Sequence, residues 1–380
     1  MNPFKYGETV TGDAFLGRKE QVEELQGHLR SGQNVVLFGE RRVGKTSLAK
    51  EAYRALGKNY DLVIIDINNI KSTQELVEVM GASCAMLTGL SRPKEMARSL
   101  LGTVKGAVPT IPMPRPDGSL SAPFEFTGPN YQVDDIFNAI ARSHKERPLV
   151  VLFDEFQGIL GCEDTERVQA LLRSFIQHQP DVPYIFAGSI RSEMYKIFMD
   201  PGAPFFKSAL PMEVGPIDRQ EICDSIRRIF KDKNGSSVED GVLEFAYDMV
   251  SGVTGDLSQL CSMMWGLLSQ HERVTFDVLE RGIERILAAC HRNYEALLRP
   301  LTEKQARVLY ALAILGGEKP LSHKFQKHTN LPPTTIQGAI ERLRSNQIIF
   351  QPYNKGEHRF YDPFFLVWLA HRKLGQAVTS

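Results

Sequence analysis

The first half of the chain contains four short runs of almost continuous apolar residues, separated by longer segments in which apolar residues recur every three or four positions. The runs are NVVLF at 34–38, DLVIIDI at 61–67, RPLVVLFDEF at 147–156 and VPYIFAGSI at 182–190. Runs of this length are typical of strands buried on both faces of a parallel sheet, and the periodic segments are typical of amphipathic helices. The pattern predicts an α/β fold with a parallel sheet.

The interval between the second and third runs is too long for one crossover helix. Helices are expected around 72–88, 92–101 and 133–145, and an insertion occupies about 90–130. Within it, VPTIPMPRPDGSLSAPFEF at 108–126 has the turn PDGS between two arms, which predicts an exposed hairpin, while its prolines favour edge or non-sheet structure. The insertion is either a contact for a partner or part of the packing.

Helical spacing dominates the second half of the chain. It predicts helices at 218–232, 242–270 and about 275–297, which together would form a small helical lid over 216–299. A lid of this kind, placed after an α/β core, commonly converts ligand occupancy into a change of shape.

The last unit is expected to span 300–380. LTEKQARVLYALAIL, SHKFQKHT and TTIQGAIERLRSNQ predict three helices, and IIFQPY and EHRFYD predict two strands around the turn NKG. This order of elements is that of a winged helix-turn-helix domain.

Composition and charge narrow the classes of function. No segment approaches the roughly 18 apolar residues that a membrane span needs, so a cytoplasmic protein is expected. Five widely spaced cysteines without a CxxC pair indicate neither a disulfide framework nor a zinc site. Lys plus Arg and Asp plus Glu number 45 each, which gives no argument for a polyanionic partner. The region from Lys319 to Arg359 differs, because it has seven Lys/Arg and two acids.

The first apolar run is followed by GERRVGKTS at 39–47. Gly39, Gly44, Lys45 and Thr46 have the spacing of a loop whose N–H groups surround a polyphosphate, with the lysine on the outer phosphates and the hydroxyl on Mg²⁺. ATP or ADP with Mg²⁺ is therefore the expected ligand. Further candidates for nucleotide contact in this loop are Arg42, Val43 and Ser47.

The third apolar run ends in two adjacent carboxylates, Asp154 and Glu155, at the edge where open α/β sheets bind ligands. We expect Asp154 to hold Mg²⁺ together with Thr46, and Glu155 to polarise the water that attacks the γ-phosphate. The alternative is a strand that ends in a solvated acidic turn.

Two residues after the fourth run are candidate catalytic groups. Ser189 could sense the γ-phosphate or orient the water, and Arg191 could reach the same phosphate. Ser189 is also a candidate helix N-cap, since Glu193 follows soon after. Arg191 is equally well explained as an exposed helix residue.

The order of FLGR at 15–18, GERRVGKTS at 39–47, VLFDEFQ at 151–157 and AGSIRSEM at 187–194 resembles the archaeal-type ATPase family. That family belongs to the STAND and AAA+ branch of P-loop ATPases, and the C-terminal YDPFFLVWL is similar to it too. The resemblance implies a P-loop core of the ASCE, AAA+-like type over 1–215, followed by the lid and the winged helix.

The resemblance also implies a role for FLGR. In these ATPases and in the archaeal origin-recognition initiators, the corresponding segment lines the adenine pocket, which makes candidates of Phe15, Leu16, Gly17 and Arg18. The alternative is a helix start, with Gly17 ahead of RKEQVEELQGHL.

Two positions depart from the family's pattern. GVTGDLSQL at 252–260 is similar to the sensor-2 region, but Ser258 stands where the initiators have arginine, and the proline of STAND members is absent. Lys207 stands where relatives commonly carry an arginine that could act on a neighbour's nucleotide, and lysine lacks the bidentate fork of arginine. Slow hydrolysis, or an arginine finger from elsewhere, is expected.

The third helix of the winged domain would face double-stranded DNA with Thr334, Thr335, Gln337, Arg342 and Arg344. Lys355, His358 and Arg359 on the wing could contact phosphates. Winged helices of this superfamily also serve as protein-protein or autoinhibitory modules, so the partner stays open.

These observations predict an ATPase that hydrolyses ATP to ADP and phosphate with Mg²⁺ and acts as a molecular switch. Its nucleotide state would control DNA binding, or assembly as a homo-oligomer or with a protein partner. Two alternatives stay open: an initiator-like DNA-binding protein that uses ATP as a structural ligand, and a protein-assembly module of a signalling or defence system.

Overall fold

The computed structural model describes residues 2–68, 70–90, 107–109, 124–126, 133–352 and 356–374. The chain divides into two compact units. The sheet unit comprises residues 9–215, and the helical unit comprises residues 216–380 together with residues 1–8. Within the described part of the chain, no helix combines the length and the apolarity that crossing a bilayer requires.

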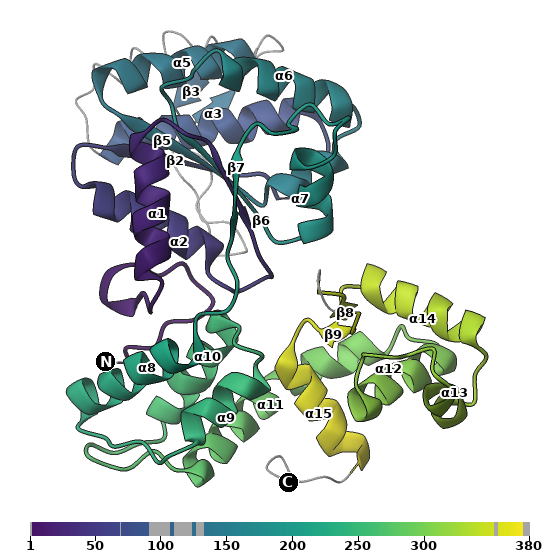
Figure 1. The fold of residues 1–380 in the computed structure, drawn as a ribbon. Coiled ribbons are helices and arrows are strands. Elements are labelled where there is room, and N and C mark those ends of the chain that lie inside the picture. The colour runs from purple at the N-terminus through teal and green to yellow at the C-terminus, as the bar shows by residue number, and fades with distance from the viewer. Residues whose placement is uncertain are drawn as a thin grey trace. The chain divides into compact units, whose positions relative to one another are not determined.

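Five parallel strands in the order β2-β5-β6-β1-β7 form the centre of the sheet unit (Figure 1). They are β1 (Val35–Phe38), β2 (Asp61–Asp66), β5 (Leu149–Asp154), β6 (Tyr184–Gly188) and β7 (Leu210–Glu213). The first four coincide with the four apolar runs, so the predicted fold class is confirmed. β7 is missing from the predicted elements because its sequence does not have the pattern of a buried strand. Only Met212 of its four residues is buried, and it contains a proline, Pro211.

Successive residues of the central strands face opposite sides of the sheet and enter two separate cores. On β1, Val36 and Phe38 join the core that includes α3, α5 and α6, while Val35 and Leu37 join the core that includes α1 and α2. The two helical layers are visible on the two faces of the sheet (Figure 1). The helices of this unit are α1 (Lys19–Arg30), α2 (Lys45–Leu56), α3 (Thr73–Leu90), α5 (Val133–Glu146), α6 (Thr165–Gln177) and α7 (Arg191–Phe198), with the 3-10 turns η1 (Gly12–Ala14) and η2 (Phe156–Gly161).

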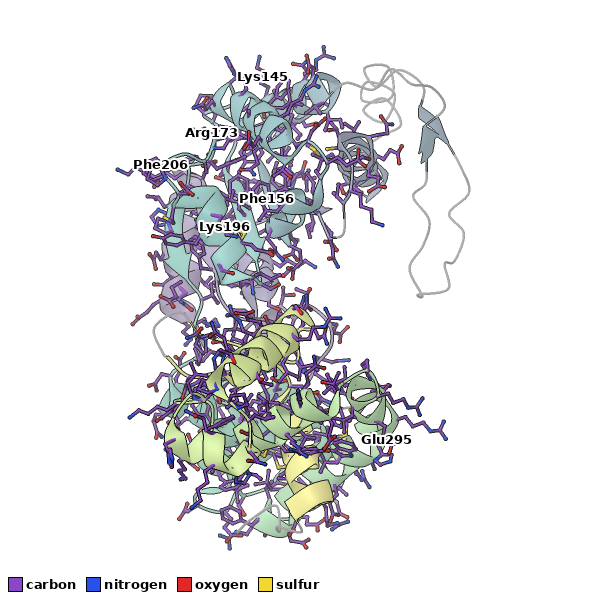
Figure 2. All side chains as sticks on the ribbon, turned by 90° about the vertical axis from the view of Figure 1, so that its right-hand side faces the viewer. Lys145, Phe156, Arg173, Lys196, Phe206 and Glu295 are labelled. Atoms are coloured by element: carbon purple, nitrogen blue, oxygen red, sulfur yellow. The ribbon has the colours of Figure 1, made fainter. Side chains whose placement is uncertain are left out.

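An aromatic cluster fixes the path of the chain after β5. Phe156, labelled in Figure 2, is fully buried, and its ring centroid lies 4.8 Å from that of Phe186 and 5.3 Å from that of Phe205. Because Phe156 directly follows Glu155, this packing also sets the position of that carboxylate.

The described part of the insertion contains two short strands. β3 (Ala107–Pro109) and β4 (Phe124–Phe126) pair antiparallel, as expected for the arms of the predicted hairpin. The turn PDGS and the helix expected at 92–101 lie outside the described residues.

The helical unit begins with α8 (Arg219–Asn234), α9 (Val242–Met249), α10 (Thr254–Trp265) and α11 (Phe276–Leu298). The prediction of one helix over 242–270 is wrong, because α9 and α10 are separate. Between them, Ser251 and Gly252 have φ of 52° and 72°, in the left-handed region that ends a right-handed helix. A Cβ on Gly252 would lie 2.7 Å from the Tyr247 ring, so only glycine fits this turn.

The N-terminal residues pack in the helical unit, whereas the predicted core of 1–215 assigned them to the sheet unit. The ring of Phe4 lies 5.0 Å from Phe230 and 5.9 Å from Trp265, and Phe4 is 4% exposed. The side chain of Asn2 donates hydrogen bonds to the carbonyl oxygen and Oγ of Ser262, at 3.0 and 2.8 Å. The chain therefore passes from the helical unit to the sheet unit near residue 9 and returns near residue 216.

The winged helix follows the predicted order. Its elements are α12 (Glu303–Leu315), α13 (His323–Thr329), α14 (Pro333–Ser345) and the antiparallel pair β8 (Ile349–Phe350) and β9 (Arg359–Phe360). Thr302 and Gln305 form a capping box at the start of α12.

A further helix, α15 (Pro363–Leu374), contains most of YDPFFLVWL and packs on α11. The Tyr294 hydroxyl donates to Asp362 at 2.8 Å, and Trp368 Nε1 donates to His291 Nδ1 at 3.1 Å. The final turns of α11 therefore belong to the packing of the winged helix, while α11 also packs on α10.

Candidate functional site

The glycine loop connects the carboxyl end of β1 to the start of α2. Gly44 has φ 96°, a conformation that residues with a Cβ rarely adopt. A Cβ on Gly39 would lie 2.3 Å from the carbonyl oxygen of Val214. The fold therefore requires glycine at both positions that define the loop.

Lys45 is 6% exposed and lies inside the loop. Its ammonium donates to the carbonyl oxygens of Gly39 at 3.0 Å and Glu40 at 2.8 Å. Burial lowers the pKa of Lys45 to about 8, although the nearby carboxylates of Glu155 and Asp154 oppose this shift. Phosphate oxygens would replace neutral carbonyl acceptors with charged ones, which form stronger bonds with an ammonium.

Thr46 and Asp154 meet at the start of α2 and the end of β5. The Thr46 hydroxyl donates to Oδ2 of Asp154 at 2.7 Å. Burial raises the pKa of Asp154 above its ordinary value, although the hydrogen bond from Thr46 opposes this shift. A hydroxyl and a carboxylate are hard oxygen ligands, so these residues fit Mg²⁺.

Glu155 has φ 48° and ψ 43°, the left-handed conformation, directly after β5. Its Oε2 accepts a hydrogen bond from the Ser189 hydroxyl at 2.6 Å and another from Nε2 of Gln157. Oε1 accepts no hydrogen bond from the described residues. The carboxylate is therefore fixed by side chains on one oxygen and is not part of a merely solvated turn.

Ser189 is buried at the end of β6. The residue at the N-cap of α7 is Ile190, so Ser189 does not fill the alternative role of a helix cap. The side chain of Arg191 lies outside the described part of the structure. Lys207 has φ 53°, and its ammonium lies 5.2 Å from the centroid of the Phe206 ring.

FLGR lies beside the glycine loop. Arg18 is buried, has φ 62° and donates through one guanidinium nitrogen to the carbonyl oxygens of Val43 at 2.9 Å and Gly215 at 2.6 Å. Phe15 packs against the core that contains α1 and α2. Because α1 begins at Lys19, the segment is also a helix start, and its role in binding adenine stays a prediction.

Two contacts that the sequence analysis missed attach the segment before FLGR to α2. The Ser47 hydroxyl accepts from the backbone N–H of Val10 at 3.1 Å, and Glu51 accepts from the N–H of Gly12 at 2.8 Å. Ser47 and Glu51 are four positions apart and therefore share one face of the helix. That spacing is the only signal in the sequence that could have pointed to this pair.

At the sensor-2 region, Asp256 and Leu257 are buried at the start of α10. In the winged helix, Thr334, Gln337, Arg342 and Arg344 are exposed on α14, and Thr335 is half-buried.

The wing differs from the expected basic surface. Arg359 forms an ion pair with Glu357, which offsets its charge. Burial and the nearby Arg344 lower the pKa of His358. Lys355 lies outside the described residues.

Residues 15–260 match the family described as "ATPase domain predominantly from Archaea". The chain belongs to this family. Residues 292–371 match a family described as a probable winged helix domain. The resemblance inferred from the motifs is thus confirmed, and the chain is a member of an ATPase family with a C-terminal winged helix.

Two solved structures share the architecture. A Walker-type ATPase of Pyrococcus abyssi is 18% identical, with a TM-score of 0.66, and the alignment covers 97% of this chain and 99% of that one. The Orc1 protein of Aeropyrum pernix, solved in complex with DNA, is 11% identical, with a TM-score of 0.51 and coverage of 96% and 94%. At these identities the similarity concerns the fold. No curated protein matches the sequence.

Proposed function

We propose that this protein hydrolyses ATP with Mg²⁺ and that its nucleotide state controls the binding of double-stranded DNA by the winged helix. The observation that carries the proposal is the convergence of Lys45, the Thr46–Asp154 pair and the Glu155–Ser189 pair at one edge of the sheet. Membership of an ATPase family supports it.

Each group has a defined task in this proposal. Lys45 binds the outer phosphates, and Thr46 with Asp154 holds Mg²⁺, which when bound neutralises charge on the phosphates. Glu155 orients the attacking water through Oε1 and takes up its proton, while Ser189 holds Oε2. Lys207 in place of an arginine supports a slow rate of hydrolysis.

The hydrolytic part is tested by two variants. Lys45→Ala is expected to lose nucleotide binding by calorimetry, whereas Lys50→Ala on the same helix should bind as the wild type does. Glu155→Gln is expected to bind ATP but to hydrolyse it far more slowly than the wild type does, and Glu163→Gln is its matched control. Wild-type ATP affinity in Lys45→Ala, or wild-type phosphate release by Glu155→Gln, would refute the assignment.

The exposed side of α14 supports contact with DNA. Arg342 and Arg344 are two positions apart, about 200° around the helix, so they flank its exposed side on opposite edges. Such a pair suits phosphates on either side of a groove, while Thr334 and Gln337 near the helix start suit base edges.

DNA binding is tested by titrating a random duplex at several salt concentrations. Arg342→Ala and Arg344→Ala are each expected to weaken binding and to reduce the slope of log Kd against log salt by about 1. Arg307→Ala on α12, where the arginine is paired with Glu303, serves as the control. Repeating the titration with ADP and with a slowly hydrolysed ATP analogue tests the switch, which predicts different affinities in the two states.

A second candidate is a protein partner for the same surface. Glu341 is exposed on α14 directly before Arg342, and Glu357 offsets Arg359, so the winged helix is less basic than its Lys and Arg content indicates. Light scattering that shows ATP-dependent assembly without any effect of DNA would favour this candidate.

A further inference from the structure

Gln157 is a third group at the Glu155–Ser189 pair, and it is absent from the predicted site. It lies in η2, is 8% exposed, and donates through Nε2 to Oε2 of Glu155. The same nitrogen lies 3.4 Å from the Ser189 hydroxyl oxygen. Oε2 of Glu155 thus receives two donors from two different elements, η2 and the end of β6.

Two glycines make room for this arrangement. A Cβ on Gly188 would lie 2.6 Å from Oε1 of Gln157, so the glycine before Ser189 leaves space for the amide. A Cβ on Gly158 would lie 1.9 Å from the carbonyl oxygen of Ile67, and the Gly158 N–H donates to the Glu155 carbonyl at 2.8 Å. The turn that carries Gln157 is therefore held closely against the end of β2.

The amide of Gln157 is only half satisfied. Its Oε1 is buried and has no hydrogen-bond partner among the described residues. A buried acceptor without a donor destabilises the fold, and an apolar side chain of similar size would not carry this cost. What the glutamine supplies at this position is therefore the N–H group that it directs at Glu155.

We infer that Gln157 is a positioning residue for hydrolysis. With Ser189 it fixes Oε2 of Glu155, and this leaves Oε1 as the oxygen that orients the attacking water. Loss of the Gln157 N–H lets the carboxylate rotate away from the water without changing how the loop binds ATP. This inference rests on the proposed hydrolytic function of Glu155.

The first test compares Gln157→Leu with Gln169→Leu. Gln169 lies on α6, is 6% exposed and also has a buried Oε1 without a hydrogen-bond partner among the described residues, but it does not contact Glu155. Gln157→Leu is expected to lower kcat about 10- to 100-fold, the usual effect of losing a hydrogen bond to a charged group, with the Kd for ATP unchanged. Its thermal midpoint is expected to stay the same or rise. Gln169→Leu should keep the wild-type kcat.

The second test asks whether Gln157 acts through Glu155. In single-turnover assays, adding Gln157→Leu to Glu155→Gln should cause no further loss, since residues that act as a unit are not additive. Gln157→Met, which also lacks the N–H but is flexible, repeats the comparison if the leucine variant folds poorly.

The outcomes separate this inference from the function on which it rests. Phosphate release by the wild type together with full activity of Gln157→Leu and Gln157→Met would overturn the inference and leave the function intact. The same follows if the losses of Glu155→Gln and Gln157→Leu simply add, or if Gln169→Leu loses as much activity. A wild-type protein that binds ATP but releases no phosphate would overturn the proposed function and the inference with it.

Discussion

The hydroxyl of Thr46 lies 2.7 Å from Oδ2 of Asp154, which joins the first turn of α2 to the carboxyl end of β5. The strand β6 lies between β5 and β1 in the sheet, so the contact spans the edge on which the glycine loop lies. Asp154 is half-buried there, and its charge is expected to matter chiefly when a cation shares the site.

Asp154→Asn keeps the size of the side chain and an acceptor for Thr46 but removes the charge. We expect the affinity for ATP in Mg²⁺ to fall at least about 10-fold, while the affinity measured in EDTA changes little, because a bound cation is the main partner of this carboxylate. Calorimetry under both conditions is the measurement. Asp66→Asn, at the paired position on β2, is the control, and an unaltered Mg²⁺ dependence in Asp154→Asn would exclude Asp154 as a metal ligand.

Arg18→Ala should destabilise the sheet unit, because it removes the donor to the carbonyl oxygens of Val43 and Gly215. Leaving buried carbonyls without this donor costs about 1–3 kcal/mol in the free energy of unfolding. Urea unfolding with and without ATP is the measurement. Arg30→Ala, at the exposed end of α1, should be nearly neutral, and equal stability of the two variants would contradict the role given to Arg18.

Glu51 should make stability depend on pH. Its hydrogen bonds from Arg54 and from the Gly12 N–H hold its pKa below the ordinary value of 4.5. A depressed pKa contributes stability that is fully present above the unfolded value and is lost as the pH falls through the folded value. Wild type should therefore melt at a higher temperature than Glu51→Gln at pH 7, and the difference should shrink at pH 3.

The control for this pH effect is Glu20→Gln, an exposed position on α1. The difference in melting temperature between Glu20→Gln and the wild type should not shrink in this way between pH 7 and pH 3. If the difference in melting temperature between the wild type and Glu51→Gln stays constant from pH 7 to pH 3, the hydrogen bond from the Gly12 N–H to the Glu51 carboxylate does not contribute to stability.

Phe4→Ala should destabilise the helical unit by about 3–5 kcal/mol, the usual cost of removing a buried phenyl ring. Both tryptophans, Trp265 and Trp368, lie in this unit, so tryptophan fluorescence during denaturation reports on it alone. Tyr6→Ala is the matched control, since Tyr6 is 40% exposed. A fluorescence transition that is the same in Phe4→Ala and Tyr6→Ala would show that the N-terminal segment does not stabilise this unit.

The sequence predicts those parts of the site that depend on local spacing. Gly44, Lys45 and Thr46 are covalent neighbours, so their arrangement follows once a strand precedes the loop and a helix follows it. Asp154 and Glu155 are predictable because the carboxyl ends of parallel strands share one edge of the sheet.

The remaining site residues depend on contacts between distant segments. Arg18 contacts Gly215, 197 positions away, and Gln157 reaches Ser189 across 32 positions. In neither case does the residue type or its neighbours indicate the partner. The break between α9 and α10 could not be predicted either, because apolar residues recur at helical spacing on both sides of Ser251 and Gly252.

The long helix α11 connects the lid to the winged helix. It has 23 residues, a length of about 34 Å, and packs with α10 as well as with α15, which follows the wing. A rotation of about 10° about its first residue displaces its last residue by about 6 Å, close to the rise of two base pairs along a duplex. In the proposed switch, this helix would act as a lever: a small angle at the lid would become a shift of nearly two base pairs in where α14 would lie on DNA.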